Sequence, residues 1–194
     1  MVRSIPSFRK QLLEIEKLKM TSFKKMLPTK KDKQEFDKLF DNVRLYTSYL
    51  GNASNPIPLE SVFIGAVFHN YKQLLQITKE DTAIDEDSIK DDLILLLENK
   101  PEGKILFYRF SKKWHGFLYA FHKEDRLILL KMVLEVCNYD DNAINIINIQ
   151  DSQSNIDYFF FLLSMILQQK RIDMLNTDET KNTKDVTLLD FMCK

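Results

Sequence analysis

The chain has 194 residues, enough to bury a core as one domain or as two small ones. It contains only 4 glycines and 5 prolines. Sheet proteins need many tight turns, so this composition favours an all-α fold, a multi-helix bundle. The 28 Lys and Arg balance the 28 Asp and Glu, which excludes a uniformly basic, histone-like protein.

Charge is nevertheless distributed unevenly along the chain. Residues 1–44 hold twelve Lys or Arg and six Asp or Glu, a net charge of +6. Residues 79–102 hold three Lys and nine Asp or Glu, a net charge of −6. The sequence therefore predicts a molecule that is electrically polar from one segment to another.

Three helices are predicted in the first half. Ser4 and Pro6 open the first, which runs to about Lys19. A capping pair, Thr29 and Asp32, opens the second, and Gly51 and Asn52 end it. Its expected inward stripe is Phe36, Leu39, Phe40, Val43, Tyr46 and Leu50. The third begins at Pro58, ends near Ile77 and should bury Leu59, Val62, Phe63, Ala66, Val67 and Leu74.

The stretch from Thr78 to Asp87 is polar and acidic, as expected at a boundary. We therefore predict an N-terminal helical subdomain over 1–77, a C-terminal helical subdomain over 88–175 and a flexible tail over 176–194. The second subdomain should contain a helix over 88–99 ended by Pro101 and Gly103, then an aromatic-rich segment over 105–121. A helix beginning at Lys123, an Asn-rich connector and a helix from about 154 to 175 follow.

The two halves resemble each other when one is shifted by 93 residues. The shift places Asp32 on Asp125, Lys38 on Lys131, Val43 on Val136, Tyr46 on Tyr139 and Leu74 on Leu167. With one residue gapped, Phe23 and Leu27 fall on Phe117 and Phe121. An internal duplication explains this pattern, and so do two unrelated pairs of amphipathic helices.

The N-terminal segments Ser4 to Arg9, Phe23 to Leu27 and Asp32-x-x-x-Phe-Asp-x-Leu39 are followed by a helix that starts with a proline. Over about residues 3–77 this arrangement resembles a group of small archaeal proteins with no assigned activity. The resemblance implies an archaeal source.

Catalytic signatures are missing from the sequence. It has no Gly-rich phosphate loop and no Gly-x-Ser-x-Gly elbow. Cys137 and Cys193 form neither a disulfide framework nor a metal set. His115 and His122 are seven residues apart, and we expect both to be partly buried in an aromatic cluster. We predict no catalytic residue, no metal and no cofactor, so the chain is expected not to be an enzyme.

Two cationic groups suggest contact with nucleic acid. The first surrounds one predicted turn and contains Lys24, Lys25, Lys30, Lys31 and Lys33, with Lys38 and Arg44 beyond it. The second mixes Arg109, Lys112, Lys113, Lys123 and Arg126 with Phe110, Trp114 and Tyr119. Aromatic side chains among cations can stack on bases, but the same spacing describes a core face flanked by lysines.

The C-terminal segment ends in an apolar cluster that follows a polar stretch. Leu188, Phe191 and Met192 have the i, i+3, i+4 spacing of a short helical plug. The segment resembles the PIP box that binds the sliding clamp PCNA, Gln-x-x-aliphatic-x-x-aromatic-aromatic. Leu188 and Phe191 match it, whereas Asp185 replaces the glutamine and Met192 the second aromatic. The alternative is a tail packed on the protein's own surface.

These observations predict a cytoplasmic, non-enzymatic adaptor that docks on a protein partner, with the sliding clamp and DNA replication or repair as the leading context. The alternative is a regulatory protein that binds DNA or RNA through the basic N-terminal region, its tail only structural. The longest apolar stretch, Tyr158 to Leu167, is too short to span a membrane, so no membrane association is expected.

Overall fold

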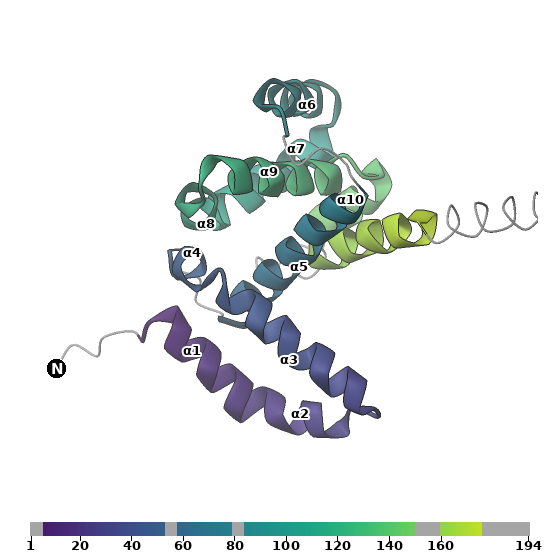
Figure 1. Cartoon of the computed structure of the whole chain (residues 1–194). Helices are drawn as coiled ribbons and strands as arrows, with labels where there is room; N and C mark the ends of the chain where they lie inside the picture. Colours follow the sequence, from purple (N-terminus) through teal and green to yellow (C-terminus); the bar gives the residue numbers. More distant parts are fainter. Residues whose placement is uncertain (1–5, 53–57, 79–83, 150–159, 176–194) are drawn as a thin grey trace, which may run out of the picture.

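A computed structural model describes residues 6–52, 58–78, 84–149 and 160–175, and Figure 1 shows how these segments are arranged. Each regular element within these ranges is a helix. The predicted all-α class and helical-bundle architecture are therefore confirmed.

The chain begins with a hairpin of helices. Helix α1 (Phe8–Glu14) continues through a π-helical segment η1 (Ile15–Met20) into α2 (Thr21–Met26), so this helical run extends past its predicted end at Lys19. Helix α3 (Lys30–Arg44) then returns beside it (Figure 1). Ion pairs link the two arms, one between Lys24 and Asp37 at 2.5 Å and one between Glu16 and Arg44.

The predicted capping pair of α3 is confirmed. The Asp32 amide donates to the Thr29 hydroxyl at 3.0 Å, and the Thr29 amide donates to the Asp32 carboxylate at 3.1 Å. The predicted continuation of this helix to Leu50 is wrong, because the helix breaks after Arg44 and a separate short helix α4 (Thr47–Gly51) follows. At the break the Thr47 hydroxyl donates to the Arg44 carbonyl at 3.0 Å, a local bond that competes with the helical ladder.

Helix α5 (Pro58–Ile77) lies at the centre of the molecule, as Figure 1 shows. It buries residues around much of its circumference, as a central helix must. Its predicted length is confirmed, but the prediction that Phe63 points inward is wrong. The Phe63 side chain is exposed at one edge of the core, and its ring centroid lies 6.0 Å from that of Phe161.

The second half contains α6 (Glu86–Asn99), α7 (Pro101–Lys113), α8 (His115–Ala120), α9 (Lys123–Cys137), α10 (Asp141–Ile149) and a helical segment over 160–175. The prediction that Gly103 helps to end a helix is wrong, because Gly103 lies in the first turn of α7. A Cβ at this position would lie 2.2 Å from the Cys137 carbonyl oxygen, so glycine allows α7 to approach α9 closely. The predicted Asn-rich connector is also wrong, because most of it forms α10.

Of the two explanations that the sequence left open, the helix boundaries favour an internal duplication over two unrelated helix pairs. A shift of 93 residues moves the bounds of the run from α1 through η1 onto those of α7, and the bounds of α3 onto those of α9. A shift of 94 moves α2 onto α8. Two segments of similar sequence pattern thus give the same succession of helix lengths.

Both halves contribute to one cluster of buried apolar side chains, which extends from Phe8 to Leu163. Across it, the rings of Tyr49 and Phe121 stack at 4.5 Å. An ion pair at 2.5 Å between Lys72 and Asp125 also joins the halves. The division into subdomains 1–77 and 88–175 stays a prediction, and residues 79–83 of the proposed boundary lie outside the described ranges.

Candidate nucleic-acid interface at the turn between α2 and α3

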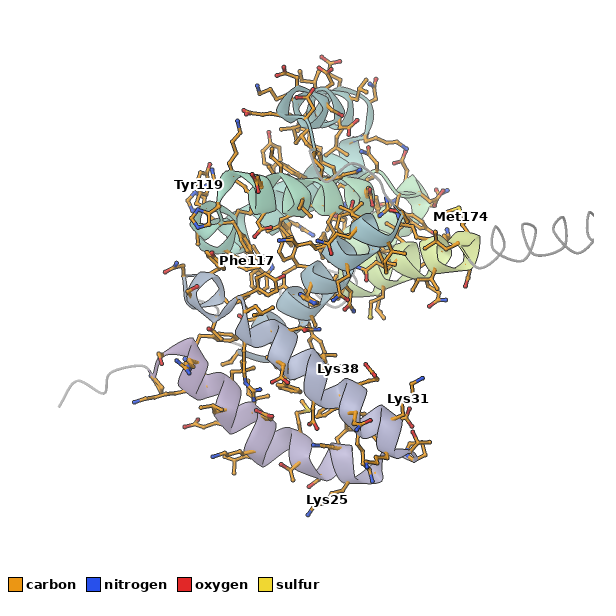
Figure 2. All side chains as sticks on the ribbon, in the orientation of Figure 1. Lys25, Lys31, Lys38, Phe117, Tyr119 and Met174 are labelled. Atoms are coloured by element: carbon orange, nitrogen blue, oxygen red, sulfur yellow. The ribbon has the colours of Figure 1, made fainter. Side chains whose placement is uncertain are left out.

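The turn between α2 and α3 is fixed by its own sequence. Leu27 adopts an extended conformation, as a residue before proline prefers, and Pro28 follows it. Thr29 and Asp32 then cap α3. The lysines before and after the turn are therefore held at one end of the hairpin. Figure 2 shows Lys25 and Lys31 at this end of the molecule, directed away from its centre.

The predicted lysines are in two different situations. Lys25, Lys30 and Lys31 are exposed and Lys33 is partly buried, and no acidic side chain in the described ranges forms an ion pair with any of the four. Lys24 is different, because its ammonium group lies 2.5 and 2.7 Å from the two carboxylate oxygens of Asp37. Lys24 therefore holds α2 against α3, and the remaining lysines are available to an anion.

Apolar surface adjoins these cations. Met26, the last residue of α2, is 83% exposed, and Phe23 is 53% exposed although its ring lies 5.7 Å from that of Phe36. We call the exposed surface formed by Lys25, Met26, Lys30 and Lys31 the basic tip. It combines positive charge with an apolar contact area.

The second predicted cationic group does not form a comparable surface. Phe110 and Trp114 are buried in the core, so neither ring can stack on a base. Lys113 pairs at 2.9 Å with Glu60, a carboxylate whose side chain is buried. Lys123 pairs with Glu86, and Arg126 donates to backbone carbonyls at the end of α8. Lys113, Lys123 and Arg126 thus have partners within the fold, whereas Lys112 and Tyr119 of the same group are exposed. With two of its three rings buried, the group matches in part the core face flanked by lysines that the sequence left open.

The histidines also differ from the prediction. His115 and His122 are both exposed, and they share no helix face, because His115 begins α8 whereas His122 lies between α8 and α9. The partly buried histidine is His69, whose Nδ1 lies 3.0 Å from the Tyr46 hydroxyl. Burial and the charge of Lys72 lower the pKa of His69. Burial and Asp125 raise the pKa of Tyr46 to about 12.

Within the described ranges, neither metal binding nor a reactive cysteine is indicated. The described residues contain no cluster of His, Cys, Asp or Glu side chains that could hold a metal ion. Burial raises the pKa of the Cys137 thiol, which disfavours the reactive thiolate.

A partly buried polar network was not predicted. The Tyr71 hydroxyl donates to Glu135 at 2.7 Å, and the guanidinium of Arg171 donates to the same carboxylate at 2.8 and 3.1 Å. Gln168 donates to the Val67 carbonyl at 3.1 Å. The partners are far apart in sequence, so periodicity and spacing carried no signal for them.

The predicted docking residues Asp185, Leu188, Phe191 and Met192 lie outside the described ranges. Their role stays a prediction.

Residues 1–93 match a domain of unknown function (DUF8156). No curated protein and no solved structure matches the chain. The resemblance to archaeal proteins covers part of the matched range and stays a prediction. Among the described helices, none has both the length and the apolar character that crossing a bilayer requires.

Proposed function

We propose that this protein is a non-enzymatic accessory protein that binds nucleic acid through the basic tip. The observation that carries the proposal is the position of Lys25, Lys30 and Lys31, exposed around one turn at an end of the molecule. A phosphate backbone presents closely spaced negative charges, and several lysines on one short surface can contact it together. The chain has no net charge overall, so attraction for a phosphate backbone has to come from a local basic surface such as the tip.

The proposal is tested by measuring oligonucleotide binding over a series of salt concentrations. Lys25→Glu with Lys31→Glu should remove most of the binding. Each lost phosphate contact should lower the slope of log affinity against log salt by about 0.9, so the double variant should lower it by about 2. Lys10→Glu with Lys17→Glu is the matched control, because both lysines are exposed and belong to neither predicted cationic group. Equal binding by both double variants would refute the proposal.

A second candidate function is docking on a protein partner, for which a sliding clamp is the leading candidate. The observation in its favour is the sequence of residues 185–192, where Leu188 and Phe191 occupy anchor positions of the PIP box. Each buried apolar anchor contributes about 1.5–3 kcal/mol, and ordering the peptide offsets part of this, so affinity should be about micromolar.

Docking is tested by titrating a peptide of residues 180–194 against a purified sliding clamp, beside the full-length double variant Leu188→Ala with Phe191→Ala. Docking predicts that the peptide binds, and that the variant loses clamp binding at an unchanged melting temperature. If the peptide does not bind the clamp and the variant has a lower melting temperature, the tail instead packs on the surface of the same chain.

A further inference from the structure

One face of α6 is exposed, acidic and apolar at once. Asp91, Ile94, Leu95 and Glu98 follow the i, i+3, i+4, i+7 spacing that places side chains along one side of a helix. All four are exposed, and the two apolar residues are 50% and 56% exposed. Within the described part of the chain, no cation pairs with Asp91 or Glu98. We call this surface the acidic stripe.

The acidic stripe complements the basic tip in chemistry. The acidic stripe has Ile94 and Leu95 beside its carboxylates, and the basic tip has Met26 beside its lysines, so apolar surface adjoins charges of opposite sign. Opposite potentials guide association, and burial of the apolar side chains stabilises the contact. Figure 1 shows α6 at one extreme of the molecule and the turn between α2 and α3 at the opposite one. A basic tip therefore meets an acidic stripe only on another copy of the chain.

The matching helix bounds of the two halves give an independent reason to expect that another protein surface covers α2. Phe23 on α2 corresponds to Phe117 on α8, and the two differ in environment. Phe23 is half exposed, whereas Phe117 is fully buried. Helix α8 packs on α4 of the first half, where the ring of Phe121 stacks on Tyr49. Helix α8, which corresponds to α2, is thus covered by another helix, whereas the matching surface of α2 is exposed.

We propose that copies of this chain associate head to tail, with the basic tip of one copy bound to the acidic stripe of the next. The contact joins two different surfaces, so it leaves one of each free at the ends and extends into open chains unless the geometry closes a ring. The self-association rests on these two surfaces alone. If the tip also binds nucleic acid, as the proposed function states, then nucleic acid and a second copy of the chain compete for it. Only this competition rests on the proposed function.

Sedimentation velocity of the full chain over a series of concentrations measures the association. The average mass should increase with protein concentration at about 0.05 M salt and fall towards that of the monomer at about 0.5 M, because salt screens exposed charges. A native chain that stays monomeric throughout the low-salt series would overturn the proposal.

Charge reversal identifies the two surfaces. A tip variant, Lys25→Glu with Lys31→Glu, and a stripe variant, Asp91→Lys with Glu98→Lys, should each be monomeric alone because like charges then face each other. Mixed in equal amounts, they should associate again, since each surface meets its opposite on the other variant. Controls with reversed charges elsewhere, Lys112→Glu and Glu14→Lys, should associate like the native chain. A mixture that stays monomeric, or a single variant that associates like the native chain, would overturn the pairing.

The stripe variant also separates this inference from the proposed function. It keeps the native tip and should be monomeric, so under the proposed function it should bind an oligonucleotide at least as tightly as the native chain does. Failure to bind would count against nucleic-acid binding only. Self-association of the native chain, together with association of the mixed tip and stripe variants, would support the head-to-tail contact whether or not nucleic acid binds.

Discussion

The Tyr71 hydroxyl donates a hydrogen bond to the Glu135 carboxylate at 2.7 Å and so joins α5 to α9. Arg171, from the helical segment over 160–175, donates to the same carboxylate and lies with its guanidinium 5.2 Å from the centre of the Tyr71 ring. Burial and the negative charge of Glu135 raise the pKa of Tyr71, so its hydroxyl stays protonated and donates. Three segments from distant parts of the sequence thus meet at one carboxylate.

Tyr71→Phe should lower the free energy of unfolding by about 1.5–3 kcal/mol, the contribution of a hydrogen bond to a charged group. Glu135 keeps its bonds to Arg171, which favours the lower end of this range. Urea unfolding monitored by circular dichroism measures the change. Tyr108→Phe on α7 is the control, because Tyr108 is exposed and should tolerate the loss of its hydroxyl. Equal stability of the two variants would show that the network contributes nothing.

Gly103→Ala should destabilise the protein by about 1–3 kcal/mol, as overpacking of a close contact does. The added methyl would lie 2.2 Å from the Cys137 carbonyl oxygen and 2.9 Å from the Leu96 side chain, so α7 and α9 would have to separate. Gly51→Ala is the matched control, because its nearest neighbour would be 3.7 Å away on the Phe8 side chain. Thermal unfolding should show a lower melting temperature for the first variant only.

The features that sequence predicted well depend on local chemistry. The capping box of α3 requires only Thr29 and Asp32, three residues apart, and the start of α5 requires only a proline at the first turn. The basic tip was predictable for the same reason, because a short turn brings its lysines together.

The features that sequence missed depend on contacts between distant residues. Glu135 lies 64 residues from Tyr71, and no period or spacing links them. Gly103 looked like a helix terminator, but its role is set by the approach of Cys137 from another helix. Lys24 belonged to the predicted cationic run, yet Asp37 on the opposite arm of the hairpin pairs with it. Only the tertiary structure distinguishes Lys24 from Lys25.

Stability should fall in mild acid because of His69. The folded state lowers its pKa, mainly through burial and to a smaller extent through the charge of Lys72. An unfolded histidine has a pKa of about 6.5. A depressed folded pKa means that the contribution of neutral His69 is fully present above about pH 6.5 and is lost as the pH falls below that value. Its Nε2 is buried without a hydrogen-bond partner in the described ranges, so protonation finds no acceptor there.

His69→Gln keeps a polar side chain that does not titrate, so its stability should depend less on pH than that of the native chain between about pH 6.5 and pH 5. Chemical unfolding at a series of pH values measures this dependence. His122→Gln is the control for the same replacement at an exposed histidine. A His69→Gln profile parallel to the native one would assign the acid sensitivity to other groups.

Limited proteolysis should cut first within residues 78–87, because cleavage needs local opening and a polar, acidic stretch opens at low cost. The two fragments should nevertheless stay together in native buffer. The stacked rings of Tyr49 and Phe121 and the ion pair between Lys72 and Asp125 cross the cut, as does the buried cluster. Size-exclusion chromatography should show both fragments in one peak, which separates into two only in denaturant.

A change in the ion pair between Lys72 and Asp125 tests whether contacts across the cut hold the two fragments together. Lys72→Glu places a second carboxylate beside Asp125, so the cut chain should dissociate more readily than the cut native chain. Lys112→Glu makes the same change of charge at an exposed position on α7 and should leave the fragments together. Native fragments that separate in buffer while both keep their helical signal would instead show two independently folded domains. In that case the contacts between α4 and α8 and between α5 and α9 would be too weak to hold the halves together.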